Sequence, residues 1–528
     1  MVQSKGGKEF LQTEDGFQVF DGIVGSPRYY QKMKFDLIAK MEQIGPVQIF
    51  YTLSCPNKRW SAILAGILQN TRPDLLVLSS QQEKDNNLAE KSASKEKENF
   101  EYRDEDEVEE EEDNIEVFKL NKEKENYFIH EEQNLAENCP AEEKCHLHSN
   151  CRRKKLENFL DKTTANKLQA EHVLDITRNF NRRAKIFRRT ILTSKSSPLK
   201  IRYYQDRVEF QARGHPHIHG MGWSDMEELD KNLEGIKDTF QKLKQRERLS
   251  VQDIRPLQQF IDSSVTCTTN QDEIKGMIQP RKKGIKGKLS GETKCQAECD
   301  PNNCESCAEL YSKLIRERVL DVQVHNHTFT CRKNEKSCRF GIPRTPSYYT
   351  LIAQPLPEEV RKQERDTVAG ANFVMKKIEI HLKGLERQLK DQQKENKEAE
   401  ITESLEEILR ECLADIRISD NEEAIVIREG DKEHVFKTYL VQDSWKQNPR
   451  HKEYPISLLA TRDSLRASIY HFALSLGSHG AKVILKRNPK DILINNFNPH
   501  WMLFWNGNMD LQICLDYFSI ITYMTDYM

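Results

Sequence analysis

The sequence predicts an α+β fold in which helices pack on a central, mostly antiparallel sheet. Apolar residues recur at helical spacing between Tyr30 and Met41. Residues 47–53 are rich in the β-branched and aromatic side chains that strands favour. Residues 208–223 read as two short extended segments that turn near Gly214. We expect these strands to pair within one sheet.

Composition limits the classes of protein to be considered. The 528 residues correspond to several domains' worth of chain, and 31% of them are charged against 37% hydrophobic, so part of the chain is expected to bury no core. The start, MVQSKGGKEF, has no apolar signal segment, and no stretch approaches the roughly eighteen apolar residues of a membrane span. We therefore expect an intracellular chain without a membrane partner, in which the thirteen cysteines are thiols or metal ligands.

The second extended segment carries two histidines, His217 and His219. Residues two apart in a strand point to the same face, so both imidazoles would lie side by side. In a hairpin centred on Gly214, Glu209 would lie opposite His219 and Gln211 opposite His217. These oxygen ligands beside two imidazoles predict an open site for a catalytic divalent cation, Mg²⁺ or Mn²⁺. The alternative is a half-buried strand with two histidines facing solvent.

The far end of the chain carries two tyrosines, Tyr523 and Tyr527, within DYFSIITYMTDYM. On a helix this spacing places both phenols on one face, where packing is the ordinary explanation. A tyrosine can also act as a nucleophile that forms a covalent intermediate, with a nearby metal polarising the group attacked. Together with the histidine pair, the tyrosines indicate transfer of a DNA phosphodiester onto tyrosine.

Four sequence blocks, in a fixed order, make this interpretation specific. They are residues 48–64 (QIFYTLSCPNKRWSAIL), residues 209–220 (EFQARGHPHIHG), residues 338–346 (CRFGIPRTP, preceded by His325, His327 and Cys331) and residues 505–528. In these blocks the chain resembles the endonuclease part of a Helitron-type rolling-circle transposase, a two-tyrosine HUH nuclease. The resemblance implies an HUH-type sheet, a nuclear location and single-stranded DNA as partner. It also implies metal-dependent nicking with a 5′-phosphotyrosine link, followed by strand transfer.

In the expected mechanism, His217 and His219, with Gln211 or Glu209, hold the cation, and Tyr523 or Tyr527 attacks the phosphate. The order in which the tyrosines act stays open. Asp526 stands where many relatives have a lysine, and no G-x4-G-K-[ST] motif of the family's helicase domain occurs in the chain. The alternative is therefore a truncated or inactive remnant that acts as a zinc-containing nucleic-acid-binding protein.

A second group of metal-ligating residues predicts structural Zn²⁺. Eight side chains are enough for two tetrahedral sites, although the sequence does not show how they divide: Cys295, Cys299, Cys304, Cys307, His325, His327, Cys331 and Cys338. Because these residues are rich in sulfur, we assign them to structure and reserve the catalytic cation for His217 and His219.

Basic side chains are interleaved with apolar ones in residues 152–192, which we expect to be helical. The apolar positions would face the sheet, and the basic ones would face outward along a phosphate backbone or simply toward solvent. The candidates for DNA binding are Arg182, Arg183, Lys185, Arg188 and Arg189. The aromatic cluster Trp501, Phe504 and Trp505 is expected to pack in the core rather than to stack on bases.

The predicted domain organisation is a discontinuous core with insertions. An N-terminal tail (1–27) precedes the first part of the core (28–80), an acidic disordered insertion (81–135) and the continued core with the basic helix and the His-bearing strand (136–262). A Cys/His zinc-binding insertion (263–346) and a charged helical segment (355–420) come next. The C-terminal part of the core (421–528) would dock its tyrosine helix across the histidine face.

Overall fold

The computed structural model describes residues 27–55, 171–210, 215–278, 305–328, 331–332, 338–394, 401–449, 461–476 and 480–516. The predicted acidic insertion lies outside these residues. Within them the chain is α+β with antiparallel sheets, as predicted. None of the described helices is long and apolar enough to cross a membrane.

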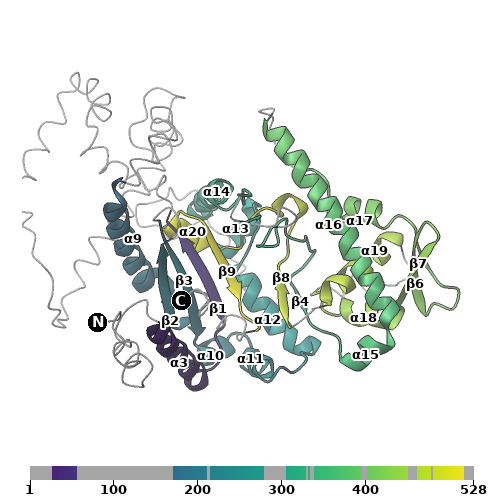
Figure 1. Cartoon of the computed structure of the whole chain (residues 1–528), viewed down its shortest axis with the longest axis horizontal. Coiled ribbons are helices and arrows are strands. Elements are labelled where there is room, and N and C mark those ends of the chain that lie inside the picture. Colours follow the sequence, from purple (N-terminus) through teal and green to yellow (C-terminus); the bar gives the residue numbers. More distant parts are fainter. Residues whose placement is uncertain are drawn as a thin grey trace, which may run out of the picture.

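A four-stranded antiparallel sheet forms the centre of the first core (Figure 1), with the strand order β2-β3-β1-β9. The strands are β1 (Ile49–Ser54), β2 (Ile201–Phe210), β3 (Pro216–Ser224) and β9 (Met509–Ile513). The His-bearing strand β3 therefore lies inside the sheet between β2 and β1. Strand β9, from the end of the chain, pairs with the other edge of β1.

One face of this sheet packs against α9 (Val173–Phe187), the π-helical turn η2 (Arg188–Leu192) and α20 (Pro499–Trp505). Helix α9 buries Ile176, Phe180, Ala184 and Phe187, the spacing expected of one helical stripe. Trp501 and Trp505 are buried at 1% and 0% exposure and meet the Phe187 ring edge-on. The expected core packing of these two tryptophans is confirmed.

The opposite face is partly covered by α3 (Pro27–Ile44). Leu37 and Met41 of this helix pack against Phe50, Met221 and Trp223 of the sheet. The indole nitrogen of Trp223 donates a hydrogen bond to the carbonyl of Gly45, the residue after the helix, at 3.0 Å. The predicted helix before β1 is thus confirmed, and it lies on the face of β3 that His217 and His219 share with Met221 and Trp223.

Helices between the His-bearing strand and the second half of the chain extend the first core. They are α10 (Met226–Asp230), α11 (Ile236–Lys244), α12 (Val251–Ser264), α13 (Gln271–Ile278) and α14 (Glu305–Val322). Ile274 and Ile278 of α13 and Ile315 and Val319 of α14 are fully buried in this core. The predicted zinc-binding insertion, 263–346, therefore shares its two helices with the sheet core, because these apolar positions recur at helical spacing between the cysteines.

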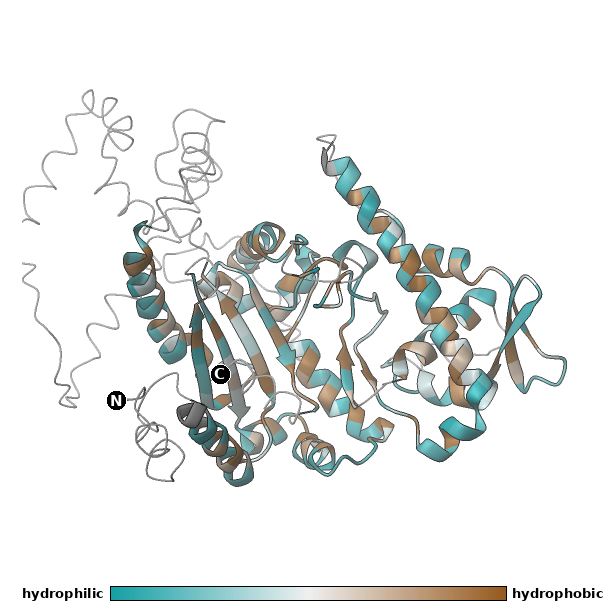
Figure 2. Ribbon diagram, viewed as in Figure 1, coloured by the Kyte–Doolittle hydropathy of each residue, from teal (hydrophilic) through white to brown (hydrophobic). Residues whose placement is uncertain are grey.

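A second hydrophobic core surrounds the long helix α16 (Arg365–Lys394). The segment predicted as charged helices is helical, but one stripe of α16, from Ala371 to Leu389, is buried. Figure 2 shows hydrophilic and hydrophobic residues alternating along this helix. Its neighbours are α15 (Glu358–Gln363), α17 (Leu405–Cys412), α18 (Thr438–Trp445), α19 (Arg462–Ser475), the sheet β5 (Ile416–Ile418), β6 (Ala424–Glu429) and β7 (Lys432–Lys437), and the pair β4 (Leu351–Ala353) and β8 (Lys482–Ile484).

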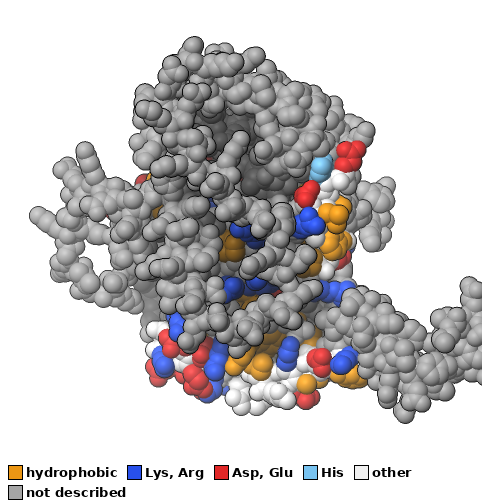
Figure 3. Space-filling model, turned by 90° about the vertical axis from the view of Figure 1, so that its left-hand side faces the viewer, with side chains coloured by type: hydrophobic (Ala, Val, Ile, Leu, Met, Phe, Trp, Pro, Cys, Tyr) orange, Lys and Arg blue, Asp and Glu red, His pale blue; other side chains and the backbone are white. Residues whose placement is uncertain are grey.

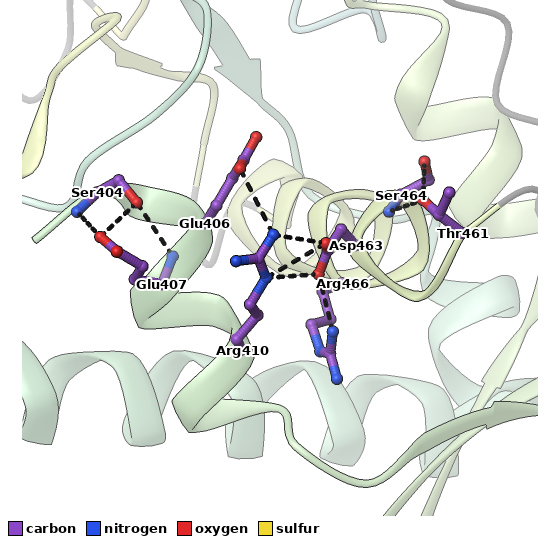
Figure 4. Close-up of polar contacts among 8 residues, drawn as sticks. All are labelled: Ser404, Glu406, Glu407, Arg410, Thr461, Asp463, Ser464 and Arg466. Atoms are coloured by element: carbon purple, nitrogen blue, oxygen red, sulfur yellow. Dashed lines mark hydrogen bonds and ion pairs between the residues drawn. The ribbon is translucent and has the colours of Figure 1, made fainter.

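A polar cluster joins α17 to α19 at the edge of this second core (Figure 4). Arg410 of α17 donates three hydrogen bonds to Asp463 in the first turn of α19, the shortest at 2.8 Å. Arg466 approaches the same carboxylate at 2.8 Å. The Arg410 guanidinium lowers the pKa of Asp463, and a carboxylate also suits the positive end of a helix dipole. Ser404 and Thr461 cap the two helices with their hydroxyl groups.

Candidate functional site

His217 and His219 lie side by side on the inner strand β3. Their ring centroids are 4.7 Å apart and the rings are nearly perpendicular. Both residues are largely buried, at 9% and 8% exposure, while Ile218 between them points into the first core at 1%. The two-residue period of a strand therefore presents two imidazoles on one face of the sheet.

The predicted hairpin register is wrong by two residues. Glu209 pairs with His217 and Arg207 with His219, so the pairing of the two strands is centred one residue before Gly214. A shift of two keeps every side chain on its predicted face. The Glu209 carboxylate consequently still reaches the Nε2 atom of His219, diagonally, at 2.9 Å. Gln211 lies outside the described residues.

The neighbouring strands add oxygen atoms to this histidine face. Ser54 of β1 pairs with His217, and its hydroxyl lies 3.1 Å from the Nδ1 atom of His217. Thr52 pairs with His219 on one side and with Asp510 of β9 on the other, so Asp510 belongs to the same face. Sequence reasoning missed Asp510, although Met509, Leu511 and Ile513 alternate with it as in a half-buried strand.

Burial keeps both histidines neutral. It lowers the pKa of His217 to about 3, with the charge of His219 adding to the effect. Burial also lowers the pKa of His219, against the opposing pull of Glu209. A neutral imidazole is the form that ligates a metal. Glu209, His217 and His219 are not, however, among the groups in the described part of the chain whose donor atoms all lie within 4.8 Å of one another.

Gly220, which follows the two histidines, allows the ring of Tyr51 to lie against the strand. A Cβ atom at this position would come within 2.1 Å of the Tyr51 ring. The Tyr51 hydroxyl donates a hydrogen bond to Asp206 at 3.3 Å, and Asp206 accepts two hydrogen bonds from Arg188, the shorter at 2.7 Å. This network ties β1, β2 and the turn after α9 together behind the histidine face.

The five basic residues predicted to contact DNA, which lie on α9 and the following turn η2, divide into two sets. Arg188 is held by Asp206, and Arg183 donates to the backbone carbonyl of Phe504 near the C-terminal end of α20, with its guanidinium 5.1 Å from the Phe504 ring centre. The exposed members are Arg182, Lys185 and Arg189. Figure 3 shows Lys and Arg side chains among hydrophobic ones on this side of the molecule. The exposed set is therefore the part of the predicted basic face that is available to a phosphate backbone.

A compact His/Cys group lies in the segment between α14 and β4. The donor atoms of His325, His327, Cys331 and Cys338 all lie within 4.8 Å of one another. The closest pairs are His327 Nδ1 to Cys331 Sγ at 3.4 Å and His325 Nε2 to Cys338 Sγ at 3.6 Å. Burial lowers the pKa of His325 to about 4 and also lowers that of His327. This group is able to hold a metal ion through two nitrogens and two sulfurs.

The remaining predicted site residues are not part of this group. Cys307 is buried on α14, at 1% exposure, and is not one of the four. Cys295, Cys299 and Cys304 lie outside the described residues, as do Tyr523 and Tyr527. The second predicted zinc site and the docking of the tyrosine helix therefore stay predictions.

One further group of potential ligands was not predicted from the sequence. His381 of α16 lies 3.0 Å from Glu403 through Nε2 and 3.6 Å from Glu411 through Nδ1. The two carboxylates approach opposite ring nitrogens, so the imidazole bridges them and the contacts among the three side chains account for the group without a metal. Its effect is to fasten α16 to α17.

Comparison of the chain with family models, with curated proteins and with solved structures found no match. Function is therefore inferred from the geometry of the two histidine groups and from the sequence blocks.

Proposed function

We propose that this chain is an HUH-type endonuclease and strand transferase that acts on single-stranded DNA. The observation that carries the proposal is the placement of His217 and His219 on an inner strand of a four-stranded antiparallel sheet, with Glu209 at 2.9 Å from His219. Two neutral imidazoles beside a carboxylate are a donor set suited to a divalent cation with open coordination positions. The resemblance of four sequence blocks to Helitron-type transposases agrees with this interpretation.

His217, His219 and Glu209 would hold Mg²⁺ or Mn²⁺, which supplies polarisation of the scissile phosphate. The hydroxyl oxygen of Tyr523 or Tyr527 attacks phosphorus and forms a 5′-phosphotyrosine bond. The bond from phosphorus to the 3′-oxygen breaks, and that oxygen leaves as a 3′-hydroxyl after gaining a proton. The second tyrosine would support strand transfer while the first remains bonded to DNA.

Three exposed basic residues of α9 and η2 are the proposed contact for the DNA backbone. Arg182 and Lys185 of α9 and Arg189 of η2 are exposed, whereas Arg183 and Arg188 are engaged within the fold. Contacts of this kind are independent of base sequence and weaken with salt.

Zn²⁺ is the proposed occupant of the group formed by His325, His327, Cys331 and Cys338. Two thiolates and two imidazoles within reach of one point match a closed, tetrahedral structural zinc site. Mg²⁺ and Mn²⁺, by contrast, prefer oxygen ligands. The chain would therefore hold a structural ion and a catalytic ion in separate places.

The decisive experiment for the nuclease is covalent adduct formation. The purified chain is incubated with labelled single-stranded oligonucleotides and Mn²⁺, and a denaturing gel then detects protein bonded to DNA. We expect an adduct that is lost in His217→Ala, in His219→Ala and in the double variant Tyr523→Phe/Tyr527→Phe. His172→Ala is the matched control, because His172 directly precedes α9 on the other side of the sheet, and it should retain the adduct.

The exposed basic set favours a second candidate, a zinc-containing nucleic-acid-binding protein without nuclease activity. This candidate predicts binding that depends on Arg182, Lys185 and Arg189 but is indifferent to both tyrosines. Salt-sensitive binding with no adduct on any oligonucleotide, from a chain with a full zinc complement, would replace the nuclease proposal with this one.

A further inference from the structure

Glu386, in the C-terminal third of α16, is a buried carboxylate beside the His/Cys group. Its side chain is 4% exposed, and its Oε1 atom lies 3.0 Å from the Nε2 atom of His327. The same oxygen lies 3.1 Å from the guanidinium of Arg332 and also accepts a hydrogen bond from Lys390. A carboxylate is costly to bury unless it is paired in this way.

The position of Glu386 determines which nitrogen of His327 remains for a metal. Because Nε2 faces the carboxylate, Nδ1 is left on the side of the thiols, and Nδ1 is the atom found 3.4 Å from Cys331 Sγ. A ligating histidine whose second ring nitrogen faces a carboxylate has a fixed tautomer and a fixed ring orientation, and is a more basic ligand.

The His/Cys group also lies between the two hydrophobic cores. On one side, helix α14 ends in the first core at Val322, and Val324, which packs against this core, forms a β-bridge with Ile494 of the same core. On the other side, Leu385 and Leu389, which flank Glu386 on α16, are buried in the second core. The segment that carries the four ligands is therefore attached to the first core, and Glu386 is attached to the second core through α16.

We propose that Glu386 is the outer carboxylate of this metal site, and that the occupied site fastens the helical core to the sheet core. The inference depends on the proposed zinc but not on the proposed nuclease activity. Zinc fixes His327, and His327 in turn holds α16 through Glu386. Glu386 is thus a positioning residue that acts through His327 and does not ligate the metal itself.

The first test is zinc affinity in the full-length chain, measured by competition with a chromophoric chelator and by elemental analysis. Glu386→Gln preserves size and removes the charge, and we expect zinc to bind about 10-fold to 100-fold more weakly, as with other outer partners of ligating histidines. Glu379→Gln is the matched control, because Glu379 lies on the same helix but is 60% exposed and paired with Lys383. Lys390→Gln removes a neighbour of Glu386 without touching His327 and should leave the affinity nearly unchanged.

A cobalt-loaded sample separates positioning from general damage to the fold. Tetrahedral Co²⁺ has strong visible absorption that depends on ligand geometry, and this spectrum should change in Glu386→Gln but not in Glu379→Gln. Wild-type affinity and spectrum in Glu386→Gln would overturn the role of Glu386. A wild-type chain that binds neither Zn²⁺ nor Co²⁺ would overturn the site itself, whatever the outcome of the adduct assay.

Hydrogen exchange tests the connection between the cores. Removal of zinc with a chelator should increase amide exchange both in the ligand segment, 324–344, and in α16 around Glu386, while β3 stays protected. Increased exchange confined to the ligand segment would overturn the coupling between the cores.

Discussion

Replacing Gly220 by alanine is expected to destabilise the His-bearing strand much more than the same change at Gly222. A Cβ atom on Gly220 would lie 2.1, 2.4 and 2.5 Å from Cζ, Cε2 and the hydroxyl oxygen of Tyr51. Tyr51 cannot swing away easily, because it is 1% exposed, packs edge-on against Trp501 at 5.4 Å and is hydrogen-bonded to Asp206. Accommodation of the methyl group must therefore move the strand backbone or the Tyr51 ring.

The size of the effect follows from two opposing contributions. Overpacking a well-packed core costs about 1–3 kcal/mol, and a clash with an immobile ring belongs at the upper end. Replacing glycine by alanine returns about 0.4–1 kcal/mol, because the unfolded chain loses conformational freedom. At Gly222 the nearest atom is the terminal methyl of Ile201 at 3.2 Å, which is able to rotate. We expect a difference of about 2 kcal/mol between the two variants.

Hydrogen exchange of the intact chain is the suitable assay, since a protein with two cores does not unfold in one step. A loss of about 2 kcal/mol corresponds to roughly 30-fold faster exchange of the amides in β3 and β1. Tyr51→Ala removes the ring, so the double variant Gly220→Ala/Tyr51→Ala should lose less than the sum of the single changes. Equal protection in Gly220→Ala and Gly222→Ala would refute the reasoning.

Three further outcomes are expected. Arg188→Met should destabilise the first core by about 2–3 kcal/mol, seen as faster hydrogen exchange in β2 and β3, because it leaves the nearly buried carboxylate of Asp206 without its charged partner. Removing that carboxylate as well should recover part of the loss. His471 is fully buried, which lowers its pKa to about 3. The unfolded chain takes up this proton below about pH 6.5, so stability should fall from there toward pH 3, and His471→Phe should flatten this slope by up to about 1.4 kcal/mol per pH unit. An unchanged acid slope would contradict this explanation. The last outcome concerns the triple variant in which Arg182, Lys185 and Arg189 are all replaced by glutamine. In anisotropy titrations with single-stranded DNA, the slope of log affinity against log salt concentration should become shallower by about 2 in this variant. An unchanged slope would show that the DNA binds elsewhere on the protein.

The elements that could be predicted from the sequence are those fixed by local periodicity. The two-residue period of a strand places His217 and His219 on one face, whatever the length of the hairpin. Helical spacing likewise separates Phe180 and Phe187, which are buried, from Arg182 and Lys185, which are exposed. In each case the side chains that decide the outcome are close together in the chain.

Features that depend on distant neighbours could not be predicted. Arg183 and Arg188 are no different in sequence from Arg182, yet a carbonyl of α20 and a carboxylate of β2 engage them within the fold. Asp510 reaches the histidine face only because β9 pairs with β1. Glu386 is one charge among many on a charged helix until the packing of α16 buries it beside His327. The helical period shows which residues of α16 are apolar, but not which charged residue the fold encloses.

The two H-x-H motifs of the chain are alike in the arrangement of their rings, which the spacing determines, and differ in their surroundings, which it does not. The ring centroids are 4.7 Å apart both for His217 with His219 and for His325 with His327, and both pairs are nearly perpendicular. The H-x-H spacing therefore places the two imidazoles in the same relative arrangement at both sites. Their surroundings differ, since oxygen atoms of Ser54 and Glu209 flank the first pair and thiols of Cys331 and Cys338 flank the second.

These neighbours, rather than the motif, assign the chemistry. Oxygen ligands favour a hard cation with exchangeable positions, whereas thiolates close a soft, tetrahedral site. Replacing Cys331 or Cys338 should thus abolish binding of the proposed zinc without affecting binding of the proposed cation at His217. Replacing Glu209 should weaken binding of the proposed cation and leave zinc binding unchanged. If either change altered metal binding equally at both pairs, the separation of a catalytic from a structural ion would have to be abandoned.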